Sequence, residues 1–126
     1  MIHCIPVKNK YLMMIARGEK KVEVHLYSKS FRRIKPGDIL LLFDSRANIV
    51  RAIVKDVRIY DSINDLVKNE NIKEILPTAN NADDLVKEMD KIYWMIGKNK
   101  LRGKKFIALE LQVIDFIKGI DYSKRA

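Results

Sequence analysis

Short apolar runs closed by turn residues constrain the fold of this chain more than any other feature. Four of them lie in the first sixty residues: 1–5, Val22–Leu26, Ile39–Phe43 and 48–60. Each run is rich in β-branched or aliphatic residues and stops at a turn signal, such as Pro6 or the Lys-Pro-Gly-Asp segment at 35–38. Runs of this length with such boundaries are typical of strands, so the first half of the chain predicts a sheet.

The pattern inside the runs predicts which faces are covered. In Val22–Leu26 apolar and polar residues alternate, which predicts one face on a core and the other in solvent. The solvated face is expected to carry Lys21, Glu23 and His25. Ile39–Phe43 is apolar throughout, which predicts burial on both faces. The longest run alternates irregularly, which indicates a bulge or bend in a long strand.

The segment between the first two runs predicts a helix. Asn9 is expected to cap a helix that runs to about Arg17, and Gly18 supplies the left-handed residue that ends it. The helix is apolar nearly all the way round, so we expect it to pack against the sheet. An exposed face with Met13 and Met14 would instead make the chain a protein-interaction module.

The acidic middle of the chain predicts further helical segments. Ser62 and Asp65 form a capping box, and a second helical turn ends at Pro77. Asn81 is expected to cap a third helix, whose apolar residues recur at helical spacing: Ala82, Leu85, Val86, Met89, Ile92 and Tyr93. Residues 106–116 return to strand character and are expected to complete the sheet beside the N-terminal strands. This order favours an α+β barrel with helices inserted on one side.

Composition bounds the organisation and location of the chain. With 126 residues, 48% of them hydrophobic, we expect one domain over residues 1–118 and a basic tail over residues 119–126. The single cysteine, Cys4, excludes an internal disulfide and favours a reducing compartment. The N-terminus has no basic leader followed by an apolar stretch, and no run approaches the ~20 apolar residues of a membrane helix. A cytoplasmic protein without a membrane partner is therefore expected.

The net charge of +9 is unevenly distributed. Residues 1–60 hold 13 Lys and Arg against 5 Asp and Glu, residues 61–95 hold 4 against 8, and residues 96–126 hold 8 against 3. A fold that pairs the two ends would gather the positive charge on one body, as expected of a phosphate-binding surface. A lysine-rich surface that only keeps the protein soluble remains the alternative.

Two basic clusters and several aromatic residues carry the nucleic-acid interpretation. One cluster precedes the Lys-Pro-Gly-Asp turn and the other precedes the last predicted strand. If the two clusters lie on one side of the sheet, they form a track for phosphates, and Tyr27, Phe31, Tyr93 and Trp94 offer stacking planes for unpaired bases, Trp94 being the better candidate than Tyr93. The clusters consist of Lys29, Arg32, Arg33 and Lys35, and of Lys98, Lys100, Arg102, Lys104 and Lys105.

Metal and cofactor sites are not predicted. His3 and Cys4 are adjacent, so a strand points them to opposite faces, and His25 has no ligand spacing to either of them. The chain also lacks the glycine-rich loops that bind nucleotide phosphates, so we expect no cofactor.

Several motifs together resemble the ASCH domain, the activating signal cointegrator 1 homology family. The family signature is G-x-K-x-x-E-x-R, and the matching positions are Gly18, Lys20, Glu23 and His25, of which the histidine departs from the pattern. The segments IKPGD, VRIYDSINDLV, EILP and IYW follow in the family's order, so the resemblance covers about residues 2–116.

The resemblance implies a PUA-like mixed β-barrel of about five to six strands. It also implies that single-stranded RNA or a nucleobase binds in a cleft lined by Lys20, Glu23 and His25. Lys20, Lys21 and His25 thereby join the two basic clusters and Trp94 as predicted RNA-binding residues. RNA is the expected partner, a small nucleoside is the alternative ligand, and the oligomeric state is left open.

A hydrolase is the second interpretation. Some bacterial members of the family remove the acetyl group from acetylcytidine with a lysine, a threonine and a glutamate. Lys20 matches the lysine, Glu23 occupies the threonine position, and Glu70 is the nearest match to the glutamate, with Glu74 a weaker one. The hydroxyl nucleophile is therefore absent. A proton-transfer set of Lys20, Glu23 and Glu70 acting on water, as in a ribonuclease, remains open, as does a merely exposed ion pair between Lys20 and Glu23.

Overall fold

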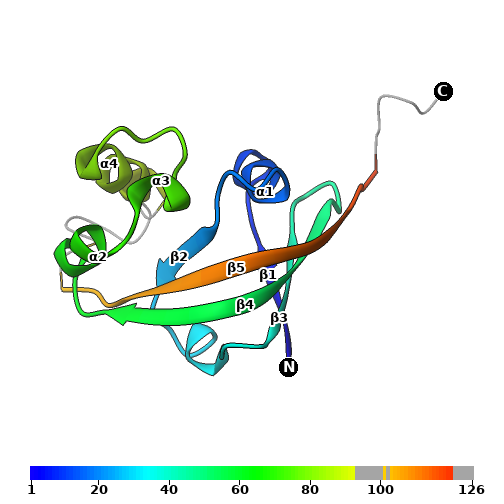
Figure 1. Ribbon diagram of the computed structural model, residues 1–126, viewed down its shortest axis with the longest axis horizontal. Coiled ribbons are helices and arrows are strands. Elements are labelled where there is room, and N and C mark those ends of the chain that lie inside the picture. Colours follow the sequence, from blue (N-terminus) through cyan, green and yellow to red (C-terminus); the bar gives the residue numbers. More distant parts are fainter. Residues whose placement is uncertain (93–100, 102, 121–126) are drawn as a thin grey trace.

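The structure is a computed structural model that describes residues 1–92, 101 and 103–120. Five strands form one sheet in the order β1-β3-β4-β5-β2 (Figure 1). Only the β1–β3 pair is parallel, and β1 and β2 are the edge strands. The strands are β1 (Ile2–Pro6), β2 (Val22–Leu26), β3 (Ile39–Phe43), β4 (Ile49–Tyr60) and β5 (Phe106–Ile117).

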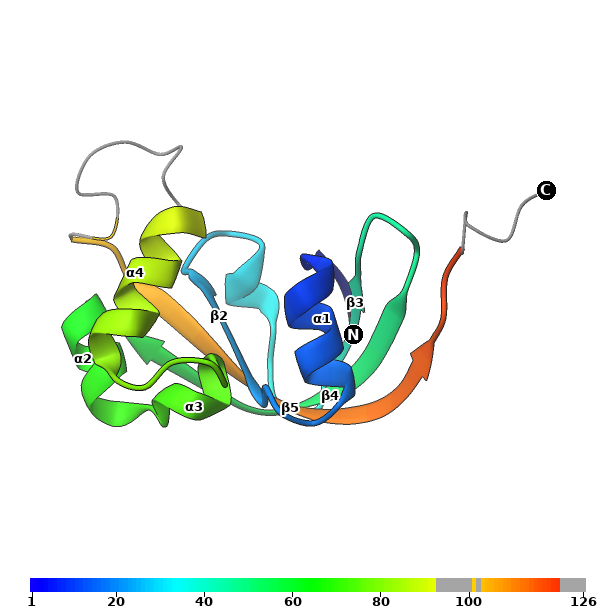
Figure 2. The same ribbon diagram turned by 90° about the horizontal axis from the view of Figure 1, so that it is seen from above.

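The sheet is curled, and in Figure 1 α1, α3 and α4 lie above it while the short cyan helix at residues 31–33 lies below. Viewed from above, α1 and a short 3₁₀ helix, η1, sit over the concave part of the sheet, while α2, α3 and α4 gather at one end (Figure 2). The predicted α+β fold is thus confirmed, and its five strands form a half-barrel. The helices are α1 (Asn9–Ala16), η1 (Phe31–Arg33), α2 (Ile63–Asn69), α3 (Ile72–Ile75) and α4 (Ala82–Ile92).

Most of the predicted helix boundaries are confirmed. Gly18 follows α1 with a φ of +76°, in the left-handed region that glycine adopts without strain. The Ser62 hydroxyl accepts a hydrogen bond from the Asp65 amide, which caps α2, and Asn81 accepts one from the Asp84 amide at the start of α4. The predicted Asn9 cap is wrong.

The Asn9 side chain makes a tertiary hydrogen bond instead of a local one. It donates to the Asp44 carboxylate at 2.7 Å, and Lys8 occupies the N-cap position of α1 without a side-chain cap bond. Asp44 is buried in the turn between β3 and β4, where it also accepts from Asn48 and from the Arg46 amide. The need to satisfy this buried carboxylate therefore outweighs the helix cap.

Two irregularities bend the long strands. The pairing of β4 with β5 shifts register between Arg51 and Ala52 and again between Val54 and Asp56. These shifts confirm the bulge predicted from the irregular alternation of residues 48–60. Because a bulge increases local twist, it lets two strands of 12 residues curl around the core.

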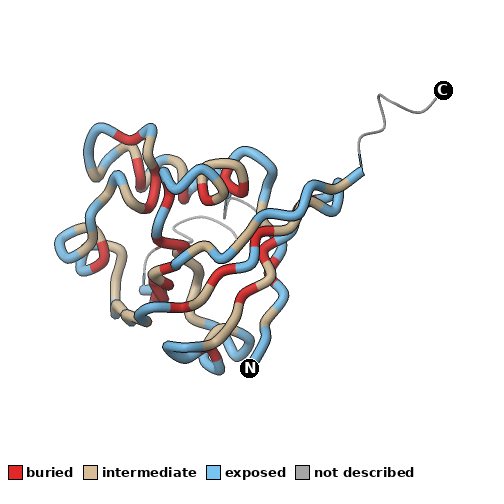
Figure 3. The backbone as a smooth tube through the Cα atoms, turned by 45° about the vertical axis from the view of Figure 1, so that its right-hand side comes forward, coloured by how far each residue is buried: buried red, intermediate tan, exposed pale blue. Residues whose placement is uncertain are grey.

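The inner face of the sheet packs on α1. Leu12 and Ile15 of the helix are fully buried against Leu40, Leu42 and other side chains of β3, β4 and β5. Figure 3 shows buried residues along the strands beneath the helices, whereas the C-terminal end of β5 is exposed. The first helix is therefore a core element.

A second core covers one end of the outer face. Phe106 and Ala108 of β5 contact the buried residues of α2, α3 and α4, including Leu66, Ile75 and Leu85. The predicted apolar stripe of the last helix is confirmed at Leu85, Val86 and Met89, but its member Ile92 is 42% exposed and Tyr93 lies outside the described residues. The acidic middle of the chain thus covers only part of the sheet.

The predicted burial of Ile39–Phe43 on both faces is wrong. Leu40 and Leu42 point inward and are fully buried, but Phe43 is 36% exposed on the outer face. No described helix covers this end of the outer face, because α2, α3 and α4 contact the other end. A continuous apolar run does not by itself show that both faces are covered.

The end of the described chain returns to the β3–β4 turn. The amide of Gly119 donates to Asn48 Oδ1, and the amide of Ile120 donates to the Arg46 carbonyl. A Cβ at Gly119 would lie 1.9 Å from that carbonyl oxygen, so this close approach requires glycine. The predicted basic tail begins at residue 119, and its residues 121–126 lie outside the described chain. None of the described helices has the length and apolarity to span a membrane.

Candidate functional site

A pocket of about 280 Å³ lies beside the free edge of β2. Its walls come from β2, the start of α1, the segment after β1, and helices α3 and α4. Apolar side chains dominate the wall, with a few charged groups among them, as in small-ligand sites generally. The lining residues that carry the argument are Tyr11, Lys20, Glu23, His25, Glu88 and Ile92.

Lys20 is buried and fully engaged. Its Nζ donates to the carbonyl oxygens of Val22 at 2.8 Å and Ile75 at 2.6 Å, and it lies 3.3 Å from Glu23 Oε1. An ammonium group has three donors, so these partners use all of them. Lys20 therefore ties α3 to β2 and holds Glu23 in place.

Glu23 is an ionised, acceptor-only group in the pocket wall. Burial raises the pKa of Glu23, but the charges of Lys20 and His25 and their hydrogen bonds outweigh burial and lower the pKa to about 2. Its Oε2 lies 2.6 Å from His25 Nε2, and because an ionised carboxylate only accepts, this nitrogen carries the proton. The His25 ring in turn stacks on Phe31, with centroids 4.2 Å apart.

This arrangement corrects the expectation that Glu23 lies on a solvated face. The side chains of Lys20 and Glu23 are only 6% and 9% exposed, so the pair is not a surface ion pair. Alternation predicted correctly that Glu23 leaves β2 on the face opposite Val22. The tertiary fold places that face inside the half-barrel opening rather than in water.

Glu88 and Tyr11 form a second polar contact in the pocket that the sequence did not reveal. The Tyr11 hydroxyl donates to Glu88, and Lys10 donates to the same carboxylate at 3.1 Å. Burial and this neighbour raise the pKa of the Tyr11 phenol, and the Tyr11 hydrogen bond lowers the pKa of Glu88. Tyr11 lies on a helix that was expected to pack against the sheet, Glu88 lies outside the apolar stripe of α4, and no motif distinguishes either residue.

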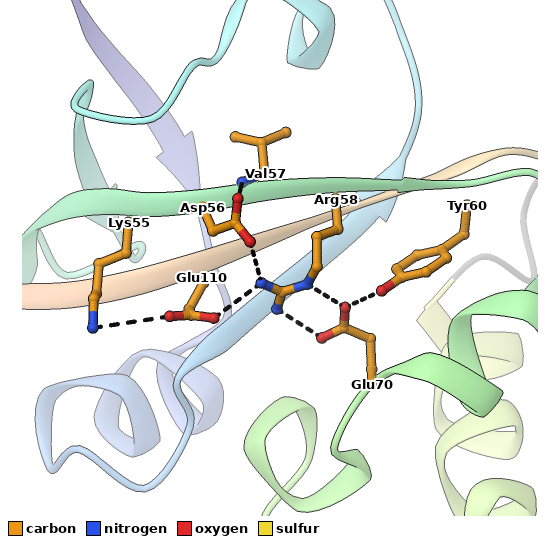
Figure 4. A network of polar contacts seen from close by, with 7 residues as sticks. All are labelled: Lys55, Asp56, Val57, Arg58, Tyr60, Glu70 and Glu110. Atoms are coloured by element: carbon orange, nitrogen blue, oxygen red, sulfur yellow. Dashed lines mark hydrogen bonds and ion pairs between the residues drawn. The ribbon is translucent and has the colours of Figure 1, made fainter.

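Glu70 does not join Lys20 and Glu23. In the paired strands Glu23 lies opposite Leu109, whereas Arg58 lies in the adjacent row with Ala108, so Glu23 and Arg58 leave the sheet on opposite faces. Glu70 is held by Arg58 in a bidentate ion pair, with Nε–Oε2 at 2.6 Å (Figure 4). The predicted set of Lys20, Glu23 and Glu70 therefore does not converge on one pocket.

The Glu70 network is a structural anchor for the segment between α2 and α3. Arg58 also contacts Asp56 and Glu110, and the Tyr60 hydroxyl donates to Glu70 (Figure 4). The hydrogen bonds with Glu70 are the main cause that raises the pKa of the Arg58 guanidinium, while burial and then Glu70 raise the pKa of Tyr60 to about 12. The network spans β4, β5 and the α2–α3 connection.

The segments that lead into the two basic clusters meet at the end of β2, where the Tyr27 amide donates to the Lys105 carbonyl at 2.9 Å. Lys35, the last cation of the first cluster, lies farther along that segment, where its amide donates to Asp38. The Arg32 guanidinium lies over the Tyr27 ring, 5.9 Å from its centroid. The exposed cations of this basic rim are Lys29, Arg32, Arg33, Lys35, Lys104 and Lys105.

Other predicted site residues have separate positions. Lys21 is exposed and does not line the pocket, and its amide donates to the Glu74 carbonyl. Lys105 of the basic rim makes an exposed ion pair with Asp61 at 3.5 Å. Four predicted RNA-binding residues lie outside the described residues: Trp94, Lys98, Lys100 and Arg102.

Comparison with known proteins finds one matching domain family and several solved structures with a similar fold. A model of the ASCH domain matches residues 5–111. The crystal structure of a hypothetical protein designated PH0355 has a TM-score of 0.75 and 28% sequence identity, over 90% of this chain and 100% of that chain. A comparison with curated proteins gives no match.

Two further structures share the fold at lower identity. Protein PF0455 from Pyrococcus furiosus has a TM-score of 0.66 and 23% identity, over 90% of this chain and 98% of that chain. A mutant of the ASCH protein from Zymomonas mobilis has a TM-score of 0.67 and 16% identity, over 98% of this chain and 77% of that chain.

Proposed function

The chain belongs to the ASCH domain family, and on that premise we propose that it binds single-stranded RNA, with one base in the pocket and the phosphates on the basic rim. ASCH domains are generally RNA-binding domains of the PUA-like kind. The observation that carries the proposal is an apolar pocket with hydrogen-bond acceptors in its wall next to segments that carry exposed cations. The pocket wall holds the carboxylates of Glu23 and Glu88 beside Lys8, Lys20 and His25, whereas the basic rim carries six exposed cations.

The pocket suits the edge of a base rather than a phosphate. Glu23 and Glu88 offer acceptor oxygens and Lys20 has no free donor for an anion, while apolar side chains such as Leu85 and Met89 cover the faces of a flat ligand. Amino groups on bases are the matching donors, as when a carboxylate accepts from cytosine N4. A base with an exocyclic amino group is therefore the expected occupant.

The basic rim suits the backbone of the same strand. Its cations are exposed, and the Tyr27 ring under Arg32 offers an aromatic surface close to them. Single-stranded nucleic acids bind through such combinations of positive grooves and stacking platforms. This arrangement favours RNA binding over the alternative that the basic residues only keep the protein in solution.

The hydrolase interpretation has weaker support from the same residues. Among the described residues that line the pocket, Tyr11 carries the sole hydroxyl group, and its raised pKa keeps it protonated as a donor to Glu88. Lys20 has no free donor or lone pair in this arrangement, and a carboxylate whose pKa is about 2 is a weak general base. Binding without covalent chemistry therefore fits the pocket better.

The protein-interaction interpretation also has weaker support. It required an exposed apolar face on α1, but Met13 and Met14 of this helix are packed against the two cores. No α1 residue is among the exposed large hydrophobic residues of the described chain. A cytoplasmic location, expected from the sequence, stays a prediction.

RNA binding is tested by measuring the fluorescence anisotropy of a labelled ten-nucleotide cytidine RNA at increasing salt concentration. Log affinity is expected to fall linearly with log salt concentration, by about 0.7 per phosphate contacted. Replacement of both Arg32 and Arg33 by alanine is expected to weaken binding and to make this slope less steep by about 1.4.

Lys118→Ala is the matched control. Lys118 is exposed and follows the C-terminal end of β5, whereas Lys105 precedes its N-terminal end, so a 12-residue strand separates the two. This variant is expected to keep both affinity and slope. Binding that is insensitive to salt, or equally weakened by the control, would contradict the proposed role of the basic rim.

A further inference from the structure

A second cleft opens next to the base pocket, between the two edge strands of the half-barrel. It has a volume of about 480 Å³, and its walls are β1, β2 and the η1 segment. His25 and Pro6 line both hollows, so the pocket and the second cleft are neighbours along one opening. Together they form a longer site than one base needs.

His25 forms the wall between the two hollows. Its Nε2 bonds to Glu23 in the pocket, and its ring stacks on Phe31 in the second cleft at an interplanar angle of 17°. His3 lies in the second cleft too, with Nε2 bonded to Asp38 Oδ2 at 2.8 Å. The second cleft therefore offers aromatic and imidazole surfaces of the kind on which unpaired bases stack.

The segment that walls the second cleft also carries the cations of the basic rim. Ser30, Phe31 and Ile34 line the cleft. The residues interleaved with and flanking them are exposed and basic: Lys29, Arg32, Arg33 and Lys35. One segment therefore supplies both the wall of the cleft and the exposed cations. A phosphate bound at the mouth of the cleft would interact with these cations.

Resting on the proposed function, we propose that the site takes two consecutive nucleotides of a strand rather than a free nucleoside. The first base lies in the pocket against Glu23. The second base lies in the second cleft against Phe31, and the phosphate that joins the two nucleotides lies near His25 and the cations of the η1 segment. A mononucleoside fills only the first half of this site.

The test is competition against a labelled ten-nucleotide cytidine RNA with three unlabelled probes. Cytidine 5′-monophosphate supplies one base, CpC supplies two bases, and cytidine 3′,5′-bisphosphate supplies one base with an additional phosphate. CpC is expected to compete roughly tenfold better than either of the other two probes, since a stacked base contributes about this much.

Two variants locate the effect. Phe31→Leu keeps an apolar side chain in the second cleft and is expected to weaken CpC about tenfold while leaving cytidine 5′-monophosphate unchanged. Phe116→Leu is the matched control, because Phe116 is exposed near the end of β5 and lines neither hollow. It is expected to leave all three probes unchanged.

The outcomes separate this inference from the proposed function. If the labelled RNA does not bind, the proposed function fails and the inference fails with it. If the RNA binds but CpC competes no better than the bisphosphate or the monophosphate, only the two-nucleotide site is overturned. An unchanged affinity of CpC for Phe31→Leu would overturn it as well.

Discussion

At the residue scale, the Lys20–Glu23 pair shows how a buried charge is accommodated in a pocket wall. The ammonium is satisfied by two carbonyl oxygens and one carboxylate, and the carboxylate is satisfied by the ammonium and His25. Removing one partner leaves the charge of the other buried with only part of its compensation, which is more costly than removing both. The effects of replacing Lys20 and Glu23 on the free energy of unfolding are therefore not expected to be additive.

Lys20→Met is expected to lower the free energy of unfolding by about 3–5 kcal/mol, because Glu23 then lacks its ammonium partner. Glu23→Gln is expected to destabilise the fold for the converse reason. The double variant is expected to lose clearly less than the sum of the two single losses, as measured by urea unfolding in a double-mutant cycle. Additive losses would show that the two groups do not act as a pair.

The depressed pKa of Glu23 predicts an acid-dependent loss of stability. The folded-state pKa is about 2 against an ordinary value of 4.5, so the stabilisation is present above about pH 4.5 and is lost as the pH falls toward 2. The full effect is about 3 kcal/mol. The difference in free energy of unfolding between the wild type and Glu23→Gln is expected to be large at pH 6 and to shrink toward pH 2.

This comparison isolates Glu23 from the other carboxylates. The hydrogen bond from His3 is the main cause that lowers the pKa of Asp38 to about 2, so the acid sensitivity of the wild type alone has more than one source. Asp38 is unchanged in the variant and cancels in the difference. A difference that stays constant from pH 6 to pH 2 would contradict the assignment.

At the element scale, local patterns predicted the elements well but not their surroundings. Some features depend only on residues that are close by in the sequence, so a local pattern is enough to predict them. These are the caps at Ser62 and Asn81, the helix end at Gly18 and the bulged long strand. The environment of β2 depends on α3 and α4, which are distant in sequence. Alternation shows that Glu23 and Val22 point in opposite directions, but not what each side chain meets.

This dependence on residues distant in sequence also explains why Glu70 was wrongly grouped with Lys20 and Glu23 and why Glu88 was missed. Glu70 follows α2 in sequence close to the segment that covers the pocket, yet Arg58 holds it on the opposite face of the sheet. Glu88 reaches the pocket only because α4 packs next to Tyr11. Neither position follows from spacing along the chain, since both depend on tertiary packing.

The Arg58–Glu70 pair is expected to hold the α2–α3 connection on β4. The Glu70 side chain is 2% exposed, so Arg58→Met leaves a buried carboxylate unpaired and is expected to cost about 3 kcal/mol in urea unfolding. Amide exchange in α3 is expected to accelerate, because that helix loses its anchor. Asp56→Asn is the control, since Asp56 is exposed and its loss is expected to cost less than about 0.5 kcal/mol.

An unchanged stability of Arg58→Met would show that the network in Figure 4 is incidental to the fold. A loss of RNA affinity in this variant, without a matching loss in Asp56→Asn, would show that the anchor also positions Ile75, whose carbonyl holds Lys20. The two readouts thus distinguish a structural anchor from one that also orders the pocket.

At the scale of the whole molecule, one half-barrel presents three environments. Its inner face is covered by α1, one end of its outer face is covered by α2, α3 and α4, and the opening between its edge strands forms the pocket and the second cleft. The other end of the outer face keeps Phe43 and Ile117 exposed. The sequence predicted a sheet with helices, but not that the helices leave this end uncovered.

This asymmetry predicts different costs for neighbouring substitutions. Leu42→Ala removes a fully buried side chain from the inner face and is expected to lower the free energy of unfolding by about 2–5 kcal/mol. Ile117→Thr lies on the outer face, where the side chain is 49% exposed, and is expected to change it by less than about 0.5 kcal/mol. Urea unfolding of both variants at one protein concentration gives the comparison. A loss at Ile117 as large as that at Leu42 would mean that the outer face is covered in solution.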